Sequence, residues 1–583
     1  MEQQTTIRRA HILWGVLVLC GFLFGARLFY LQVVRHDYYE AQAVIEHQKK
    51  FVLHAKRGLI YASSRNGVVP LVMNEPVWLL YADPRYVRDP QHTAEEVAKA
   101  IGGNIQEYKS QLSQAKKSYV VLAKKLTKAQ ADSIKKAELY GIGLTPSERR
   151  VYPEGQLGAQ IVGFVNDEGI GQYGLEGKLD NRLNGTDGLL HAVTDVRGIP
   201  LSISNQNVMK PARDGENLVL TIDRNVQSYA EEALKVGLDK VKATRGSAVV
   251  MDPSTGEVVA MANYPTYDPA KYTDVKDYNA FQNSVISLPY EAGSVIKVLT
   301  MATGINEKVI TKDSTFDNRD QVQVDDATIK NVVKHPGKTS MTDVLQNSLN
   351  TGVVHVLSQL GGGKINYQAR QKLYQYFTDR FGFGATTGIE LAGEAPGYLF
   401  SPDEEQGNTV RYANMSFGQG MTVTMLQDAA AFSSAINGGV YYKPHVLKGT
   451  YDSETGKVTS TEKITKKIVL NSDTSNQVRE MIMTALRNTP ALDGADRAGY
   501  NIGGKSGTSQ IIDKKTGKYI DENAIGTYIG FGGNETPKYV IMVRVEDSKI
   551  GAAAYAGSAA AAPIFADISN WLLDYYKIPP LTH

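Results

Sequence analysis

Cysteine is almost absent from this sequence of 583 residues: Cys20 is the single one. One cysteine excludes an intrachain disulfide and any metal site that needs several cysteine ligands. The ten histidines show no H-E-x-x-H or comparable spacing of metal ligands, so we expect no metal and no other cofactor. Excess charge is lacking as well. A formal net charge of +2 with 21% charged residues gives no reason to expect a nucleic-acid partner.

Long apolar runs are also rare, and only the segment 12–34 is long enough to cross a bilayer core of about 30 Å as a helix. Arg27 interrupts it, and this long side chain can extend toward one membrane interface. Arg8 and Arg9 precede the segment, and positive residues favour the cytoplasmic side. A cleaved signal peptide is the alternative, but no A-x-A-like site closes the apolar run. We therefore expect an uncleaved anchor, with residues 1–11 in the cytoplasm and the bulk of the chain outside.

The chain is too long for one ordinary domain, and we expect a boundary near residues 211–215. Before that boundary, Arg65-Asn66-Gly67 predicts a hairpin turn. Helices are expected over 38–50, 94–101 and 128–139. The segment 116–136 is rich in lysine, which most often indicates a solvated helical face. Contact with anionic lipid or with an anionic polymer is a weaker alternative.

Beyond the boundary, strands and helices segregate along the sequence instead of alternating. The predicted strands are 217–223, 247–251, 257–261, one that begins at Lys505, 528–531 and 539–545, and the predicted helices are 226–241 and 563–576. Turns are expected over 252–256 and over 552–562. This segregation indicates an α+β fold with an antiparallel sheet flanked by helices.

Three short motifs occur in a fixed order in this second part. They are Ser294-Val295-Ile296-Lys297 (S-x-x-K), Ser348-Leu349-Asn350 (S-x-N) and Lys505-Ser506-Gly507-Thr508 (K-[ST]-G-T). Each residue alone is more often a solvent-facing polar group than a catalytic one. The ordered trio is far more specific, because each motif supplies a different part of one acyl-transfer site.

The chemistry of the trio can be followed from its side chains. A serine hydroxyl needs a neighbouring base to act as a nucleophile, and in a helix Ser294 and Lys297 would lie on one face. A desolvated lysine beside a second cation can lose its proton near neutral pH. Lys505 could be that cation and could also bind a substrate carboxylate. Ser348 could relay a proton to the leaving amine, and Asn350 could hold a substrate amide.

With these residues in place, the chain resembles the class B penicillin-binding proteins, membrane-anchored peptidoglycan transpeptidases, over nearly its whole length. The segments that carry the resemblance, besides the anchor and the trio, are Arg57-Gly58, Arg65-Asn66-Gly67, Arg150-Val151-Tyr152-Pro153, Asp252 to Glu257 and Ser416 to Gly420. The resemblance implies a cytoplasmic N-terminus over 1–11, a transmembrane anchor over 12–34, a pedestal domain of the dimerisation type over 35–213 and a transpeptidase domain over 214–583.

The resemblance also implies a role for each catalytic residue. Ser294 would be the acylated nucleophile and Lys297 its general base. Ser348 and Asn350 would be the proton relay and the holder of the substrate amide. Lys505 would stand at the sheet edge where the donor peptide lies.

The substrate-binding residues implied in the same way are Ser506, Gly507 and Thr508, along that sheet edge. The backbone N–H groups of Ser294 and Thr508 would form the oxyanion hole. The chain departs from the family pattern at Ala292, where proline is common, and at Ser509, where alanine is common; neither position carries chemistry.

The implied activity is the cross-linking of a donor to an acceptor stem peptide of peptidoglycan, with release of the terminal D-Ala. β-Lactams would acylate the same serine. The protein would be a single-pass protein of the plasma (inner) membrane with its catalytic domain outside the cytoplasm. No glycosyltransferase domain is expected before the pedestal, so glycan polymerisation would need a partner. In this family that partner is typically a SEDS-family glycan polymerase, together with other wall-synthesis membrane proteins.

Three other functions stay open. A serine β-lactamase shares the trio, but an anchor and a long pedestal are unexpected for a small secreted hydrolase. A D,D-carboxypeptidase differs only in that water, instead of an amine, accepts the acyl group. The non-enzymatic alternative is a β-lactam sensor or a wall-assembly scaffold with a vestigial pocket, and the intact Ser294, Lys297 and Lys505 argue against the vestigial version.

Overall fold

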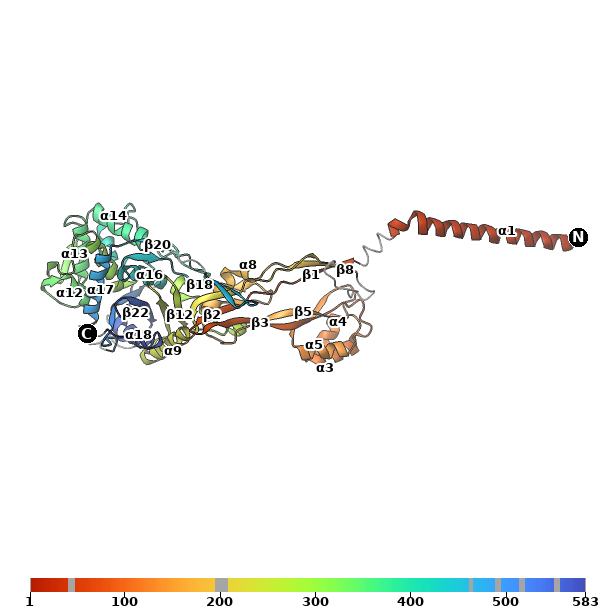
Figure 1. Ribbon diagram of the computed structural model, residues 1–583, viewed down its shortest axis with the longest axis horizontal. Helices are drawn as coiled ribbons and strands as arrows, with labels where there is room; N and C mark the ends of the chain where they lie inside the picture. The colour runs from red at the N-terminus through yellow and green to blue at the C-terminus, as the bar shows by residue number, and fades with distance from the viewer. Residues whose placement is uncertain are drawn as a thin grey trace. The chain divides into compact units, whose positions relative to one another are not determined.

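The computed structural model describes residues 2–39, 48–193, 208–460, 465–487, 494–512, 519–549 and 556–581. Contacts divide the chain into two compact units. Met1–Arg57 with Asn184–Gly215 form the first unit, and Gly58–Leu183 with Glu216–His583 form the second. Figure 1 shows the helices and strands of the chain and labels many of them.

The first unit begins with a long apolar helix, α1 (Glu2–Phe29), which continues through a π-helical turn, η1 (Tyr30–Val34). Within it, His11–Val34 is long enough and apolar enough to span a membrane, and no part of this stretch is buried against protein. The helix predicted over 12–34 is therefore confirmed.

The first unit also contains three antiparallel strands, in the order β1-β8-β9. They are β1 (Gln48–Leu53), β8 (Gly188–Val193) and β9 (Val208–Lys210). The helix expected over 38–50 is wrong at its end, because Gln48 begins β1 and pairs with Val193. Residues 40–47 of that expectation lie outside the described residues. A strand partner far away in the sequence decides this conformation, and local sequence does not reveal such a partner.

A seven-stranded sheet in the second unit has the order β19-β18-β10-β2-β3-β4, with β5 also paired to β3. Its strands are β2 (Ile60–Ser64), β3 (Gly67–Ala82), β4 (Val120–Leu126), β5 (Ile142–Val151), β10 (Leu218–Asp223), β18 (Leu447–Asp452) and β19 (Lys457–Ser460). Ser64 pairs with Gly67, so the hairpin predicted at Arg65-Asn66-Gly67 is confirmed. β3 has 16 residues, which corresponds to about 50 Å.

Three helices pack at the Ala82 end of β3 and form a small lobe with its own apolar core (Figure 1). They are α3 (Pro90–Ile101), α4 (Ile105–Leu112) and α5 (Lys128–Lys136). Each begins at a polar cap: Asp89 and Asn104 accept backbone N–H groups of the first turn, and Thr127 forms a capping box. The helices predicted over 94–101 and 128–139 are confirmed, with α3 beginning earlier and α5 ending earlier.

The second sheet of this unit has five antiparallel strands in the order β12-β11-β23-β22-β21. They are β11 (Arg245–Met251), β12 (Val258–Tyr264), β21 (Asn501–Ile512), β22 (Tyr519–Gly533) and β23 (Pro537–Glu546). Ala248 and Val250 face a core shared with the helices α9 (Arg224–Val241) and α18 (Ala562–Tyr575), while Val249 and Met251 face the main core. Helices thus flank an antiparallel sheet on both faces, and the predicted α+β fold is confirmed.

The main core lies between this sheet and a helical layer. The layer contains α10 (Ser284–Ser287), α11 (Lys297–Asn306), α12 (Met341–Gln346), α13 (Asn350–Leu360), α14 (Tyr367–Gln375), η6 (Tyr376–Arg380), α15 (Thr409–Met415), α16 (Met425–Ile436) and α17 (Ser472–Arg487). Every residue of α16 is buried, so this helix is the centre of the layer.

Short elements connect these parts. They are α6 (Ala159–Val162), β6 (Phe164–Val165), β7 (Gly171–Gln172), α7 (Gly174–Lys178), α8 (Asp180–Leu183), η3 (Pro269–Asp274), η4 (Tyr278–Phe281), β13 (Thr315–Asn318), β14 (Gln321–Val324), β15 (Ala327–Lys330), β16 (Gly337–Ser340), β17 (Val440–Tyr442) and β20 (Thr465–Ile468).

The turn expected over 552–562 is wrong in its second half, while residues 552–555 lie outside the described residues. Gly557–Ala561 form a π-helical turn, η9, that leads directly into α18. Its small residues allow a close approach to the sheet: a side chain at Gly557 would place its Cβ 2.1 Å from the carbonyl oxygen of Gly507. The alanine-rich composition therefore serves packing against β21 and not chain reversal.

Candidate active site

Ser294 lies in a 3-10 turn, η5 (Gly293–Ile296), that leads directly into α11. The prediction that this serine stands at the start of a helix is confirmed. Gly293 has a φ of +64° and donates its N–H to the carbonyl of Gly418 at 3.0 Å. A Cβ at Gly293 would lie 2.6 Å from the carbonyl oxygen of Thr508, so only glycine fits here. The backbone before the half-buried Ser294 is thereby packed between β21 and the Ser416–Gly420 segment.

Lys297 is completely buried at the first position of α11. Its Nζ donates to the carbonyl oxygen of Ser348 at 2.6 Å and contacts the Ser348 hydroxyl at 3.2 Å. Burial, together with the nearby charge of Lys505, holds the pKa of Lys297 well below its usual range. The lowered pKa favours the neutral form of the amine, which is the form that a general base needs.

Lys505 is on β21, the strand at one end of the five-stranded sheet. It is almost fully buried, and its Nζ donates to the carbonyl of Ser506 at 3.1 Å. Burial lowers the pKa of Lys505 to about 8. Ser506 and Thr508 are partly exposed on this strand, whereas Gly507 is buried. A Cβ at Gly507 would lie 2.8 Å from the carbonyl of Ala292, which keeps β21 close to η5.

Ser348 and Asn350 flank the junction between α12 and α13. Ser348 has a φ of +53°, a left-handed conformation that is rare outside glycine and often found at functional sites. This conformation presents both its carbonyl and its hydroxyl oxygen to Lys297. Asn350 is the first residue of α13, and its Nδ2 donates to the carbonyl of Lys330 at 2.9 Å.

Asn331 is a residue that the sequence analysis did not single out. It follows the β14–β15 hairpin, and its Oδ1 accepts from the N–H of Thr351 at 3.0 Å and from the Thr351 hydroxyl at 3.1 Å. Leu349, the N-cap of α13, has no side-chain acceptor, so Asn331 supplies the cap from another element. The one sequence signal was the density of Asn and Asp over 318–331, which is equally typical of turns.

The structure thus brings two lysines and one serine of the trio into direct contact or electrostatic interaction: Lys297, Lys505 and Ser348. Ser294 is placed beside them by the start of α11 and by the contact of Gly293 with Thr508. No hydrogen bond of the Ser294 hydroxyl is found within the described ranges. Asn350 is two residues from Ser348 and is oriented by the hairpin.

Comparisons with known proteins agree with this arrangement. The model of the penicillin-binding protein transpeptidase domain matches residues 246–570, and that of the penicillin-binding protein dimerisation domain matches residues 52–220. The chain is 33% identical to stage V sporulation protein D of Bacillus subtilis over 98% of this chain and 85% of that protein. It is 28% identical to the peptidoglycan D,D-transpeptidase FtsI of Escherichia coli over 98% of this chain and 93% of that protein. The chain belongs to the class B penicillin-binding proteins.

A solved class B penicillin-binding protein has the same fold. Penicillin-binding protein 3 of Mycobacterium tuberculosis, in complex with aztreonam, matches with a TM-score of 0.69 at 25% identity, over 91% of this chain and 98% of that one. The family predicted from the motifs is therefore confirmed. The apolar helix His11–Val34 is consistent with a single-pass membrane protein. The roles of individual site residues stay predictions.

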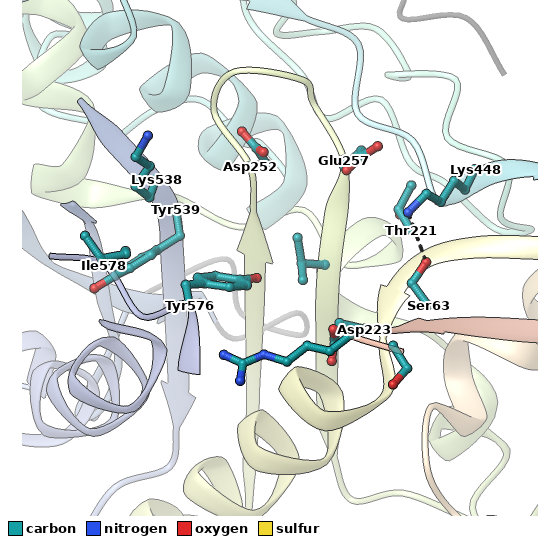
Figure 2. Close-up of a pocket in the computed structure, with 13 residues that line it drawn as sticks. Ser63, Thr221, Asp223, Asp252, Glu257, Lys448, Lys538, Tyr539, Tyr576 and Ile578 are labelled. Atoms are coloured by element: carbon teal, nitrogen blue, oxygen red, sulfur yellow. Dashed lines mark hydrogen bonds between the residues drawn. The ribbon is translucent and has the colours of Figure 1, made fainter. Parts of the chain in front are cut away.

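Figure 2 shows another pocket of this penicillin-binding protein, about 370 Å³ in volume, which contains none of the predicted site residues. It lies where β2 and β10 meet β12 and β23, and charged residues of both signs line it, among them Asp252 and Lys448. Asp223, which also lines it, caps α9 and accepts the hydroxyl of Tyr575 at 3.0 Å. The side chain of Asp223 thus links the end of β10 to α9 and α18.

Proposed function

We propose that this penicillin-binding protein cross-links peptidoglycan stem peptides through an acyl-enzyme on Ser294. The observation that carries the proposal is the environment of Lys297, a fully buried lysine beside a second lysine, with a lowered pKa. A buried cation is costly and is avoided when the amine is neutral. A neutral amine three residues from a serine at the start of a helix is suited to activate that serine.

In the first half-reaction, Lys297 accepts the hydroxyl proton of Ser294, and the serine oxygen attacks the carbonyl carbon of the penultimate D-Ala. The backbone N–H groups of Ser294 and Thr508 bind the oxyanion, a contribution of about 3 kcal/mol per donor in other serine acyl-transfer enzymes. The bond to the terminal D-Ala breaks, and its amine takes up a proton that Lys297 passes on through the Ser348 hydroxyl. A serine ester and free D-Ala result.

In the second half-reaction, the amine of an acceptor stem peptide attacks the ester. Its proton passes to Lys297 and from there to the leaving oxygen of Ser294, so that the hydroxyl and the neutral amine are both restored. An amide bond between two stem peptides has then replaced the D-Ala–D-Ala bond. A β-lactam reacts at the same serine by opening its ring, and it leaves a stable ester.

The donor peptide lies along β21 as an added strand, a common mode of peptide recognition at a sheet edge. Ser506, Gly507 and Thr508 provide the edge. Lys505, when protonated, binds the terminal carboxylate, and Asn350 holds a substrate amide through its paired donor and acceptor. A carboxylate at Lys505 raises the pKa of this lysine, so substrate binding favours the charged form of Lys505 and the neutral form of Lys297.

The proposed setting is the plasma (inner) membrane, with residues 1–11 in the cytoplasm, the anchor over 12–34, the pedestal over 35–213 and the transpeptidase domain over 214–583 outside. Arg8 and Arg9 support this orientation. Cross-linking requires freshly polymerised glycan, and we propose a SEDS-family polymerase and other wall-synthesis membrane proteins as partners.

Fluorescent β-lactam labelling tests the nucleophile. Full-length protein should be labelled stably, and Ser294→Ala should not be labelled, while its thermal unfolding stays nearly unchanged because one oxygen at a half-buried site contributes little packing. Ser110→Ala, at an exposed serine of α4, is the matched control and should be labelled like the wild type. Labelling that persists in Ser294→Ala would contradict the assignment, and release of the label within the labelling time would indicate a β-lactamase.

A second assay separates the transpeptidase from the carboxypeptidase. Wild-type protein, lipid-linked precursor and a glycan polymerase should yield cross-linked peptide dimers, and Ser294→Ala should yield none. If only shortened monomeric stem peptides appear, where another transpeptidase forms dimers, water is the acceptor and the protein is a D,D-carboxypeptidase.

A further inference from the structure

The small lobe formed by α3, α4 and α5 on β3, β4 and β5 carries a dense group of lysines. Between positions 109 and 136 the sequence has eight lysines and one acidic residue, Asp132, which is a local net charge of +7 in a chain whose total is +2. The lysines of this basic face are Lys109, Lys116, Lys117, Lys124, Lys125, Lys128, Lys135 and Lys136. The remainder of the chain is therefore net acidic.

Most of the basic face lacks counter-charges on the protein itself. All of its lysines except the half-buried Lys109 are exposed. Lys125 pairs with Asp167 at 2.8 Å, and Lys124 also interacts with that carboxylate. The other six form no ion pair with any residue that the structure describes.

The fold directs these lysines outward. In α5, Ala131 and Ile134 are buried in the lobe, and the helical period places Lys128, Lys135 and Lys136 on the solvent side. Lys124 and Lys125 have another explanation, because they lie on β4, an edge strand, and lysine on an edge strand hinders its pairing with the strands of other molecules. That effect does not explain the lysines of α5 or of the loop before β4.

An aromatic side chain accompanies the charges. Tyr119, in the same loop as Lys116 and Lys117, is 54% exposed and stacks on Tyr81 with a distance of 5.0 Å between ring centroids. Tyrosine and lysine together are favoured at the boundary between lipid headgroups and water, because the ring is amphipathic and the ammonium binds phosphate.

We propose that the basic face of the lobe docks on anionic phospholipid headgroups of the membrane that holds α1. Lysine binds phosphate as a point charge without fixed geometry, which suits a layer of headgroups better than one defined ligand. Several lysines near an anionic surface attract it additively within a Debye length. In the proposed setting the anchor tethers the chain to the membrane, so weak attraction between the lobe and the headgroups is sufficient.

Docking would have a mechanical consequence. β3 extends from the lobe over 16 residues, about 50 Å, and belongs to the same sheet as β10, which leads into the transpeptidase part. A lobe held at the headgroups would therefore restrict the orientations of the transpeptidase sheet over the membrane. The lipid composition would become a regulator of where the active site can reach the wall.

Energy transfer between the lobe and the bilayer tests the proposal in the full-length protein. A dye is attached to Ser118→Cys in a Cys20→Ser background, and the protein is reconstituted in nanodiscs with headgroup-labelled acceptor lipid. One set of discs contains phosphatidylcholine only, and the other contains equal parts of phosphatidylcholine and phosphatidylglycerol. We expect higher transfer efficiency in the anionic discs, and loss of the difference in about 1 M salt, where the Debye length is about 3 Å.

Two matched sets of variants show whether the basic face is responsible. The test set is Lys116→Gln, Lys117→Gln, Lys135→Gln and Lys136→Gln, and the control set is Lys235→Gln, Lys240→Gln, Lys276→Gln and Lys457→Gln, all at exposed positions. The test set should bring the transfer efficiency in anionic discs down to that in neutral discs, with an unchanged unfolding temperature. The control set should behave like the wild type.

Equal transfer in both kinds of disc, or a test set that behaves like the wild type, would overturn the proposal. Binding of soluble polyphosphate that the test set abolishes, without any effect of anionic lipid, would also overturn it and would assign the basic face to an anionic polymer. β-Lactam labelling of the test set reports on the active site separately, so failure of the lobe proposal and failure of the Ser294 assignment cannot be confused.

Discussion

Lys297 is the residue in which burial matters most for the chemistry. Its amine is completely buried and lies near the charge of Lys505. No carboxylate in the described structure forms an ion pair with it. Desolvation disfavours the ammonium form first, and the second lysine adds to the effect. The hydrogen bonds to Ser348 orient the amine, and orientation with neutrality is what a general base needs.

Lys297→Arg should show whether Lys297 acts as a general base or only as a positive charge. Arginine keeps a cation but cannot accept a proton at accessible pH, so acylation by a β-lactam should fall by about 10²- to 10⁴-fold, as for loss of a general base. The wild-type acylation rate should fall as the pH drops through the Lys297 pKa, because the protonated amine cannot accept the serine proton. Stopped-flow acylation at several pH values measures both. An arginine variant with a near-normal rate would mean that Lys297 acts only as a fixed cation.

At the scale of elements, the hairpin β14–β15 is a support for the S-x-N motif. Lys330 accepts from the Asn350 side chain, and Asn331 caps α13 in place of Leu349. Asn331 in turn donates to Asp320 at 3.0 Å and to Asn318 at 3.3 Å, so a polar network fixes its amide. Asn331 is therefore a positioning residue for the start of α13.

Asn331→Ala should slow acylation more than it destabilises the fold. The change leaves the N–H of Thr351 without its acceptor, which costs about 1–3 kcal/mol, and frees the α13 terminus that carries Asn350. The Thr351 hydroxyl keeps Asn318 Oδ1 as its acceptor, at 2.8 Å. Asn331→Asp keeps an acceptor oxygen but replaces the donor to Asp320 with a second carboxylate, so it should restore most of the rate only in combination with Asp320→Asn, which removes the repulsion. Acylation kinetics and thermal unfolding of the same samples give the comparison.

Asn366→Ala is the matched control, because Asn366 caps α14 through the N–H of Ala369 and lies outside the S-x-N network. It should lower stability by about 1 kcal/mol without slowing acylation. Equal slowing in both alanine variants would reduce Asn331 to a stability residue.

The contrast between the trio and Asn331 shows what sequence could predict. The S-x-x-K motif, the Arg65-Asn66-Gly67 turn and the strands and helices near the trio depend on local spacing and composition, and the structure has them. Asn331 accepts a hydrogen bond from Thr351, which is 20 residues away in the sequence, and β1 forms because β8 lies beside it. Contacts of this kind depend on tertiary packing, which overrides local propensity, so single-sequence patterns do not contain them.

At the scale of the whole molecule, the chain combines an apolar helix with two family domains. The dimerisation-domain model covers residues 52–220 and the transpeptidase model residues 246–570, while the apolar helix precedes both. A reaction between two stem peptides attached to glycan strands depends on where the enzyme is held, because proximity replaces free encounter. Membrane attachment and catalysis are therefore linked, and the side of the membrane on which the chain folds decides whether it meets its substrate.

Cysteine accessibility can establish that side, since the chain has only Cys20 to remove. In a Cys20→Ser background, Ser254→Cys, at an exposed turn of the transpeptidase part, should react with a membrane-impermeant maleimide in intact cells or spheroplasts. Thr5→Cys should react only after permeabilisation, because positive residues before an apolar helix, here Arg8 and Arg9, favour the cytoplasmic side. Replacing both arginines with glutamate should weaken or invert this pattern. Labelling of Thr5→Cys but not of Ser254→Cys in intact cells would place the active site in the cytoplasm, away from peptidoglycan, and the proposed cross-linking function could not stand.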